Sequence, residues 1–295
     1  MSGVIWAGLA GLFFGLHQAF FRQATSRIDA SRATLGILAV AGTLTTTLGL
    51  LIEDLSLLRT MGWFAPALFA VTGMLHFTGG WTLLGMSQQR IGASRTGIVI
   101  AASPLIGSII AAIFVDEPLT PALLVGVLLV SGGVALIARE RAPAGQIETT
   151  SRIPWHALTV ATIWGITPVM IRRGLEDLPA PLLGVAMGML GAAIAGLAIV
   201  RSGVRPSVGG PVRSVAPWIL LSGVIVGLAI TFQWQAFDAI EISIAITLFQ
   251  ISTPVVVFAA PLIARTTLER PTRVMLIGMA AIVGGSVLVI LSGGS

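Results

Sequence analysis

The sequence predicts an all-α integral membrane protein whose ten transmembrane helices form a 5+5 inverted-topology repeat around a central cavity. The first observation behind this prediction is composition: 55% of the 295 residues are hydrophobic and only 10% are charged. A soluble domain carries about 25% charged residues. Because so few charges cannot cover a water-facing surface, the lipid bilayer must be the main solvent of this chain.

The second observation is a duplication. The apolar run 93–119 returns as 243–271, and both runs contain a proline near the middle. Ser103-Pro104 of the first run corresponds to Thr253-Pro254 of the second at an offset of 150 residues. One structural unit has therefore been used twice.

Ten apolar segments reach the length of about 20 residues that a membrane helix needs. The longest polar stretch, residues 139–153, is the expected cytoplasmic linker between a first repeat at 1–138 and a second at 154–295. The loops elsewhere are too short to form another domain. The ten expected helices are 3–22, 33–52, 61–87, 94–114, 119–138, 154–173, 181–200, 214–237, 242–264 and 274–292.

The arginines give the expected orientation. All 17 basic residues are arginine, and 14 of them follow or precede helices on the side opposite the termini. Loops rich in positive charge stay in the cytoplasm, so both termini are expected on the outer side of the membrane. The membrane expected is the inner membrane of the cell. Since each repeat has an odd number of helices, the two repeats insert with opposite orientations. Such repeats place substrate near the midplane between them.

With these features the chain resembles the drug/metabolite transporter superfamily, EamA type, and within it the YddG-like aromatic amino-acid exporters. The resemblance rests on the 5+5 duplication and on short motifs at matching depths. It implies a ten-helix basket with a cavity lined by helices 1, 3, 4, 6, 8 and 9. The motifs are Phe14-Gly15, Trp164-Gly165, Arg32-Ala33, Ser103-Pro104, Thr253-Pro254 and Glu117-Pro118-Leu119-Thr120.

The distribution of charged residues limits the classes of substrate that the protein can carry. No Asp or Glu lies well inside an apolar segment, whereas the small drug exporters of this superfamily exchange protons for cations at a buried Glu of helix 1. The chain has no lysine, and its arginines lie near segment ends, which suits an anionic phosphate poorly. Scattered arginines also do not indicate nucleic-acid binding.

Polar residues inside a membrane are costly and are functional candidates by default. A stripe on one face of the ninth helix, at steps of four, three and four, consists of Ser243, Thr247, Gln250 and Pro254. A proline displaces the carbonyl four residues before it, and here that carbonyl belongs to Gln250. Pro104, which follows Ser103 in helix 4, and Pro168 in helix 6 have the same effect. These kinks either simply bend the helices or supply hydrogen-bond acceptors to a substrate ammonium.

Two histidines and three deep tryptophans complete the candidate binding residues. His17, beside Gln18, and His76 are expected past the midpoint of helices 1 and 3, and each is either a packing residue or a ligand of substrate. The tryptophans either pack the core or provide flat walls for a substrate side chain. They are Trp81, Trp164 and Trp234.

The sequence therefore predicts a transporter that exports small neutral or zwitterionic metabolites, amino acids with an aromatic preference first, by alternating access. Facilitated movement is the first expectation, and proton coupling through a histidine is the second. The alternative function is a proton-coupled multidrug or metabolite exporter, and the alternative of another class is a membrane receptor or scaffold. Its expected partners are lipid and a small-molecule substrate, with the oligomeric state open. Without Cys, an HExxH motif or paired carboxylates, neither enzymatic activity nor a metal or cofactor is expected.

Overall fold

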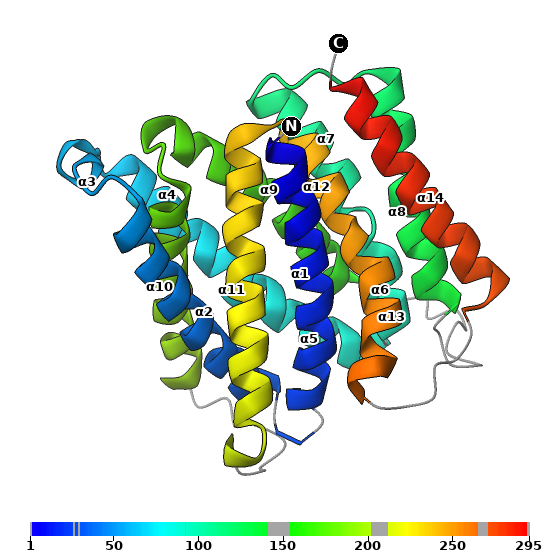
Figure 1. Ribbon diagram of the computed structural model, residues 1–295, viewed down its shortest axis with the longest axis horizontal. Coiled ribbons are helices and arrows are strands. Elements are labelled where there is room, and N and C mark those ends of the chain that lie inside the picture. Colours follow the sequence, from blue (N-terminus) through cyan, green and yellow to red (C-terminus); the bar gives the residue numbers. More distant parts are fainter. Residues whose placement is uncertain are drawn as a thin grey trace.

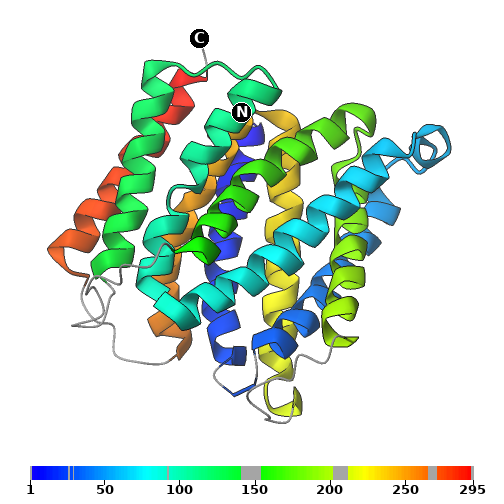
Figure 2. The same cartoon turned by 180° about the vertical axis from the view of Figure 1, so that it is seen from behind.

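The computed structural model describes residues 2–25, 27–28, 30–91, 93–140, 154–201, 212–264 and 271–293. In these ranges every regular element is a helix (Figures 1 and 2), so the all-α expectation is confirmed. Most of the expected linker, residues 141–153, lies outside the described residues.

The elements of the first repeat build five membrane helices, here named TM1 to TM5. TM1 is α1 (Ser2–Thr25) and TM2 is α2 (Ala30–Ile52), followed by the short α3 (Leu57–Thr60). TM3 comprises α4 (Phe64–Gly73), the π-helical η1 (Met74–Gly79) and α5 (Gly80–Ile91). TM4 comprises α6 (Ala93–Ile100) and α7 (Ser103–Phe114), and TM5 is α8 (Pro121–Glu140).

The second repeat supplies TM6 to TM10. TM6 is α9 (Trp155–Asp177), TM7 is α10 (Pro181–Arg201), and the short η2 (Val212–Ser214) precedes TM8, which is α11 (Ala216–Ala239). TM9 comprises α12 (Ile242–Leu248), the 3-10 turn η3 (Phe249–Ile251) and α13 (Ser252–Ala264). TM10 is α14 (Arg273–Ser292).

Nine of these helices are both long and apolar enough to cross a membrane. The tenth, α9, has 23 residues, and at 1.5 Å per residue it is about 34 Å long, which spans the hydrocarbon core. It packs against α4, α5 and α7 inside the bundle.

The helix contacts follow the twofold relation between the repeats. TM1 packs against TM8 and TM9, and correspondingly TM6 packs against TM3 and TM4. TM2 packs against TM7, and TM5 packs against TM10. Every one of these contacts is matched by its partner when the two repeats are exchanged, as a 5+5 inverted repeat requires.

Glycines set the distance between TM5 and TM10. A Cβ atom added to Gly126 would lie 2.9 Å from the carbonyl oxygen of Gly285, and one added to Gly133 would lie 2.5 Å from that of Gly278. The two contacts are equivalent, because Gly126 and Gly278 correspond at the repeat offset of 152. Close backbone approach of this kind is a common way for helices to associate in a membrane.

Equivalent threonines begin the same two helices. Thr120 Oγ1 accepts a hydrogen bond from the N–H of Leu123 (3.1 Å), and Thr272 Oγ1 accepts one from the N–H of Met275 (3.2 Å). Each hydroxyl satisfies an N–H group that has no partner within its helix.

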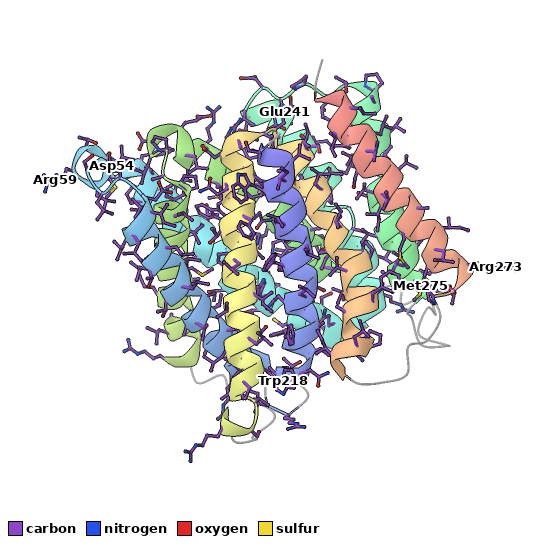
Figure 3. The ribbon with its side chains drawn as sticks, in the orientation of Figure 1. Asp54, Arg59, Trp218, Glu241, Arg273 and Met275 are labelled. Carbon is purple, nitrogen blue, oxygen red and sulfur yellow. The ribbon has the colours of Figure 1, made fainter. Side chains whose placement is uncertain are left out.

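The start of α1 and the end of α14 lie at the same end of the bundle, here called the terminal end (Figures 1 and 2). Charged side chains gather at the helix ends: Asp54, Arg59 and Glu241 lie at the terminal end, and Arg273 lies at the far end of α14 (Figure 3). The opposite end carries most of the arginines among the described residues and is here called the arginine-rich end.

Candidate functional site

TM4 and TM9 are interrupted at equivalent depths. The helix of TM4 breaks at Ala101 and Ala102, and TM9 tightens into the 3-10 turn η3, whose Ile251 corresponds to Ala101 at an offset of 150. Pro104 then lies in the first turn of α7, where a missing N–H leaves no hydrogen bond unmade.

The 3-10 turn changes one expectation from the sequence. The carbonyl of Gln250 was expected to lose its α-helical partner to Pro254. In η3 the N–H of Ser252 is shared between this carbonyl and that of Phe249, which is the i→i+3 partner of a 3-10 turn. The amide side chain of Gln250 is the other polar group at this break.

TM3 contains a π-helical turn, Met74–Gly79, which places His76 at its centre. Such turns are rare and occur often at functional sites. Gly80 ends this turn, and a Cβ atom there would lie 2.7 Å from Trp164 Nε1. The absence of a side chain at Gly80 thus makes room for the indole of TM6.

Each of the two membrane histidines is bound to a hydroxyl on another helix. His17 Nδ1 on TM1 lies 2.8 Å from Ser222 Oγ and 3.3 Å from the carbonyl oxygen of Ser222 on TM8. His76 Nδ1 on TM3 lies 2.7 Å from Thr167 Oγ1 on TM6. The two pairs join equivalent helix interfaces, and Thr167 is the repeat equivalent of His17.

Aromatic rings link these pairs into one chain across four helices. At the TM1 side, Phe14 lies 4.8 Å from Phe249 of TM9 and 5.5 Å from His17, and His17 stacks on Trp81 at 5.8 Å. These are ring-centroid distances in the range where aromatic pairs attract each other.

The chain continues through TM3 to TM6. Phe77 lies 6.1 Å from Trp81 and 4.9 Å from His76, which stacks on Trp164 at 6.0 Å. The indole Nε1 of Trp164 also donates a hydrogen bond to the carbonyl of His76 (3.4 Å). We call the rings of Phe249, Phe14, His17, Trp81, Phe77, His76 and Trp164 the aromatic chain.

Two amide side chains that follow members of this chain in sequence have no hydrogen-bond partner among the described residues. Gln18 follows His17, and Gln250 follows Phe249; both are half-buried, and neither forms a hydrogen bond within the part of the chain that the structure describes. An unpaired amide at membrane depth is unfavourable unless water or a substrate reaches it.

Exposure divides the residues selected from the sequence. Gln18, His76, Trp81, Trp164, Gln250 and Pro254 are half-buried, whereas His17, Ser103, Pro104, Pro168, Thr247 and Trp234 are buried. The buried hydroxyl of Thr247 donates to the carbonyl of Ser243 (2.6 Å). Trp234 lies apart from the aromatic chain, against Phe69 and Gly184 in the packing of TM8 with TM3 and TM7.

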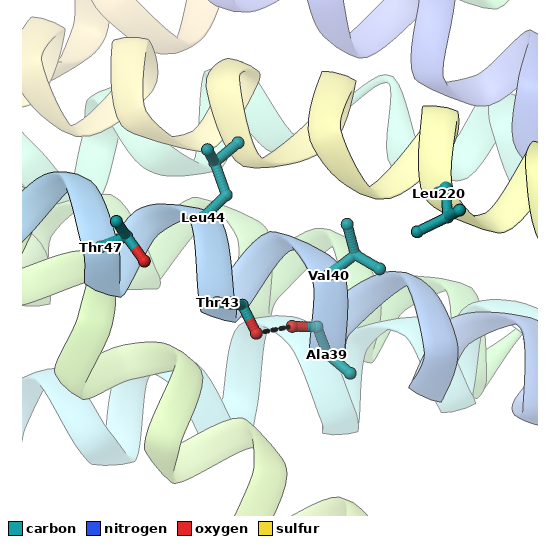
Figure 4. A pocket seen from close by; sticks show the side chains of 6 residues that line it. All are labelled: Ala39, Val40, Thr43, Leu44, Thr47 and Leu220. Atoms are coloured by element: carbon teal, nitrogen blue, oxygen red, sulfur yellow. Dashed lines mark hydrogen bonds between the residues drawn. The ribbon is translucent and has the colours of Figure 1, made fainter.

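An open groove on the bundle lies elsewhere, between α2 and α11 (Figure 4). It is lined by Ala39, Val40, Thr43, Leu44, Thr47 and Leu220 and is almost wholly apolar. The Thr43 hydroxyl donates to the carbonyl of Ala39 (2.8 Å), so it is already satisfied within its own helix. The groove therefore has few groups that could form hydrogen bonds with a polar substrate.

Comparison with known proteins gives the same architecture. The model of the EamA-like transporter family matches residues 1–139 and 153–291. A solved crystal structure of a protein superimposes with a TM-score of 0.77 at 22% identity, covering 98% of this chain and 96% of its own. A search of the curated proteins found no match.

Proposed function

Because the chain belongs to the EamA-like transporter family and is thus a membrane transporter, we propose that it exports small neutral or zwitterionic metabolites, with amino acids of aromatic side chain as the preferred substrates. The observation that carries this proposal is a pair of amides, Gln18 and Gln250, that directly follow two members of the aromatic chain in sequence and have no hydrogen-bond partner among the described residues. Polar groups that need a partner and flat apolar walls together suit an amphipathic substrate.

Trp164 and His76 would form the wall of the site. Both are half-buried and stacked, and the hydrogen bonds of the Trp164 indole and of His76 Nδ1 fix the two rings in place. A rigid wall of this kind contacts a substrate ring at little entropic cost. The proposed site is made of Gln18, His76, Trp81, Trp164, Gln250 and Pro254.

The lack of charge at this depth supports a substrate without net charge. The acidic residues that form hydrogen bonds in the described structure, such as Glu53, Glu117 and Asp177, do so at helix ends. A substrate with a net charge would lose its hydration on binding and would find no opposite charge in the site, which is costly. A zwitterion can be bound by amide and carbonyl groups that satisfy both of its charged ends.

The proposal is tested in proteoliposomes loaded with a mixture of the common amino acids. We expect selective loss of aromatic amino acids at a rate that protein-free liposomes do not show. Retention of every amino acid by correctly inserted protein would reject this substrate class and would favour other metabolites. Retention of all small molecules offered would favour the receptor or scaffold alternative.

Coupling is tested in the same preparation. Facilitated movement down the substrate gradient predicts that a protonophore leaves the initial rate nearly unchanged. Strong inhibition would instead favour proton coupling through His76, because imidazole is the side chain that titrates closest to neutral pH.

We further propose that the arginine-rich end faces the cytoplasm of the cell and that both termini face outward. A C-terminal fusion to a reporter that matures only in the cytoplasm should then remain dark. A bright reporter on inserted protein would reverse this orientation.

A further inference from the structure

A buried carboxylate at the end of TM4 holds the beginning of TM9. Glu117 is 8% exposed, and its Oε1 accepts the N–H of Ile242, while its Oε2 accepts the N–H (3.0 Å) and the hydroxyl (2.7 Å) of Ser243. The first N–H groups of a helix lack internal partners, and an anion there is favourable. We call these three hydrogen bonds the Glu117 cap.

Tight packing accompanies the cap. All seven residues of α12 are buried, and a Cβ atom on Gly107 of α7 would lie 2.4 Å from Ile246 Cδ1. TM4 and TM9 are therefore in close contact at the terminal end, where α7 and α12 lie beside the N-terminus (Figure 1).

The equivalent region at the arginine-rich end is packed less closely. Residues 245–248 of α12 are all buried, but of their repeat equivalents 95–98 in α6 only Thr96 is buried. The extensive contact of α12 with α7 also has no counterpart of similar extent between α13 and α6. Among the described residues, the repeat is thus closed at one end and looser at the other.

Two arginines of TM6 add further hydrogen bonds at the terminal end. Arg172 of TM6 donates to the carbonyls of Phe237 (2.6 Å) and Asp238 (2.8 Å) at the end of TM8, and Arg173 donates to the carbonyl of Phe114. The repeat equivalent of Arg172 is Arg22, which is exposed and whose guanidinium has no hydrogen bond to the described residues.

We propose that the Glu117 cap closes the terminal end of the transporter, holding TM9 on TM4 in this state, and that its three bonds break when this end opens. The inference adds a gating residue to the transporter and rests on alternating access, but not on which substrate is carried. Glu117 is a positioning residue here, because it acts by holding α12.

The natural absence of cysteine permits a direct test by thiol labelling. Ile246→Cys places one thiol at the contact between α12 and α7, where the native side chain is 6% exposed. The labelling rate with a polar maleimide is measured on protein in lipid nanodiscs, where both ends are accessible and no substrate is present. Adding Glu117→Gln, which replaces an acceptor oxygen by an NH2 group, should raise this rate by about tenfold, the scale set by hydrogen bonds to a charged group.

A second thiol reports on the other end. Ile98→Cys lies in α6 at the repeat equivalent of Leu248, and Ile98 is half-buried. If opening of one end closes the other, Glu117→Gln should slow labelling at position 98 while it accelerates labelling at position 246. Acceleration at both positions would indicate general loosening and would overturn the proposal.

Glu53→Gln is the matched control. Glu53 caps a different helix at the same end, since its Oε1 accepts the N–H of Leu182 at the start of TM7 (2.9 Å). This variant should leave labelling at position 246 unchanged; an increase equal to that of Glu117→Gln would reject a specific role for Glu117.

Ser243→Ala keeps the test decisive if Glu117→Gln does not fold. It removes one bond of the cap, and we expect a labelling rate between those of the parent and of Glu117→Gln. Unchanged labelling at position 246 in a folded variant of either kind, with parent-like elution and thermal unfolding, would overturn the proposal. Because no transport is measured, failure of amino-acid export in liposomes would not affect this result.

Discussion

The interfaces TM1–TM8 and TM3–TM6 occupy equivalent places in the repeat, and both are joined by a histidine and a hydroxyl. In the first, His17 lies on TM1 and Ser222 on TM8; in the second, the hydroxyl of Thr167 is on TM6 and His76 is on TM3. The roles of the two helices are therefore exchanged. The exposure also differs: His17 is only 3% exposed, whereas His76 is half-buried and lies in the π-helical turn.

This difference indicates that the helix interface is the same in both repeats, whereas the histidine–hydroxyl pair has a different function in each. Two contacts of the His17 ring nitrogen go to a single residue, Ser222, and the ring is enclosed by the bundle, as in a structural pair. His76 is stacked on Trp164 and remains partly accessible. We infer that the TM3–TM6 interface binds substrate and that the TM1–TM8 interface holds the helices together.

The sharpest test of this comparison is His76→Leu. Loss of the imidazole removes a substrate contact and leaves the Thr167 hydroxyl without its partner, at a cost of about 1–3 kcal/mol. Apparent substrate affinity in proteoliposomes should fall tenfold or more, with normal insertion. Unchanged affinity would place the site away from TM3.

His17→Leu should lower stability without changing affinity. The buried Ser222 hydroxyl loses the imidazole and keeps only the long contact with the carbonyl of residue 17 (3.5 Å), so the free energy of unfolding should fall by about 1–3 kcal/mol, measured as a lower midpoint of thermal unfolding. Apparent affinity should remain that of the parent. A large loss of affinity at parent-like stability would mean that both histidines belong to the site.

Gln250→Leu tests whether TM9 contributes to the same site. Its amide has no hydrogen-bond partner in the described structure, so the substitution should not destabilise the protein. If the amide binds substrate, affinity should fall by roughly 1–3 kcal/mol, about tenfold or more. Equal transport by variant and parent would show that the polar residues of TM9 serve helix packing and do not bind substrate.

Trp164→Ala should have a smaller and selective effect. Loss of the indole face removes an aromatic contact worth about 0.5–1.5 kcal/mol beyond its buried area, so aromatic amino acids should be affected more than small ones. Trp234→Ala is the control: Trp234 is buried in the core, 2% exposed, and its loss should lower stability without changing substrate preference. Identical losses for all substrates in Trp164→Ala would argue against a stacking wall.

Much of the fold could be predicted because it depends on local properties of the sequence. Segment length and arginine position can be read from each stretch alone, the repeat offset needs only a comparison of two stretches, and the helices lie where the apolar segments were expected. The π-helical turn was missed, since only Gly79-Gly80 marks it and two glycines have many other uses. The short α3 between TM2 and TM3 was missed for the same reason of weak signal.

The candidate site was harder to predict because its contacts join distant parts of the chain. His17, His76, Trp81 and Trp164 could each be identified from their position inside an apolar segment. The phenylalanine rings that connect them could not be identified in this way. For TM1 a signal existed: Phe14, His17 and Phe21 are spaced by three and four residues and share one face. That Glu117 caps TM9 could not be predicted, because the partner lies 125 residues away.

The smallest expected difference between the repeats concerns Glu241, which precedes TM9 and has the uncharged Ile91 as its repeat equivalent. Burial raises the pKa of Glu241 above its ordinary value of 4.5, nearby Glu117 raises it further, and Arg172 opposes both. A carboxyl with a raised pKa stabilises the fold while protonated, and this contribution is lost as pH rises through the folded-state pKa.

At neutral pH the ionised Glu241 is therefore unfavourable, and Glu241→Gln should raise the unfolding midpoint slightly. The gain should be roughly a few tenths of a kcal/mol, because solvent screens a part-exposed charge. It should disappear on acidification below the ordinary carboxyl range, where both side chains are neutral. Glu176→Gln, which breaks an exposed pair with Arg173 (2.9 Å), provides a control without this gain; a Glu241→Gln advantage that grows on acidification would contradict the assigned sign.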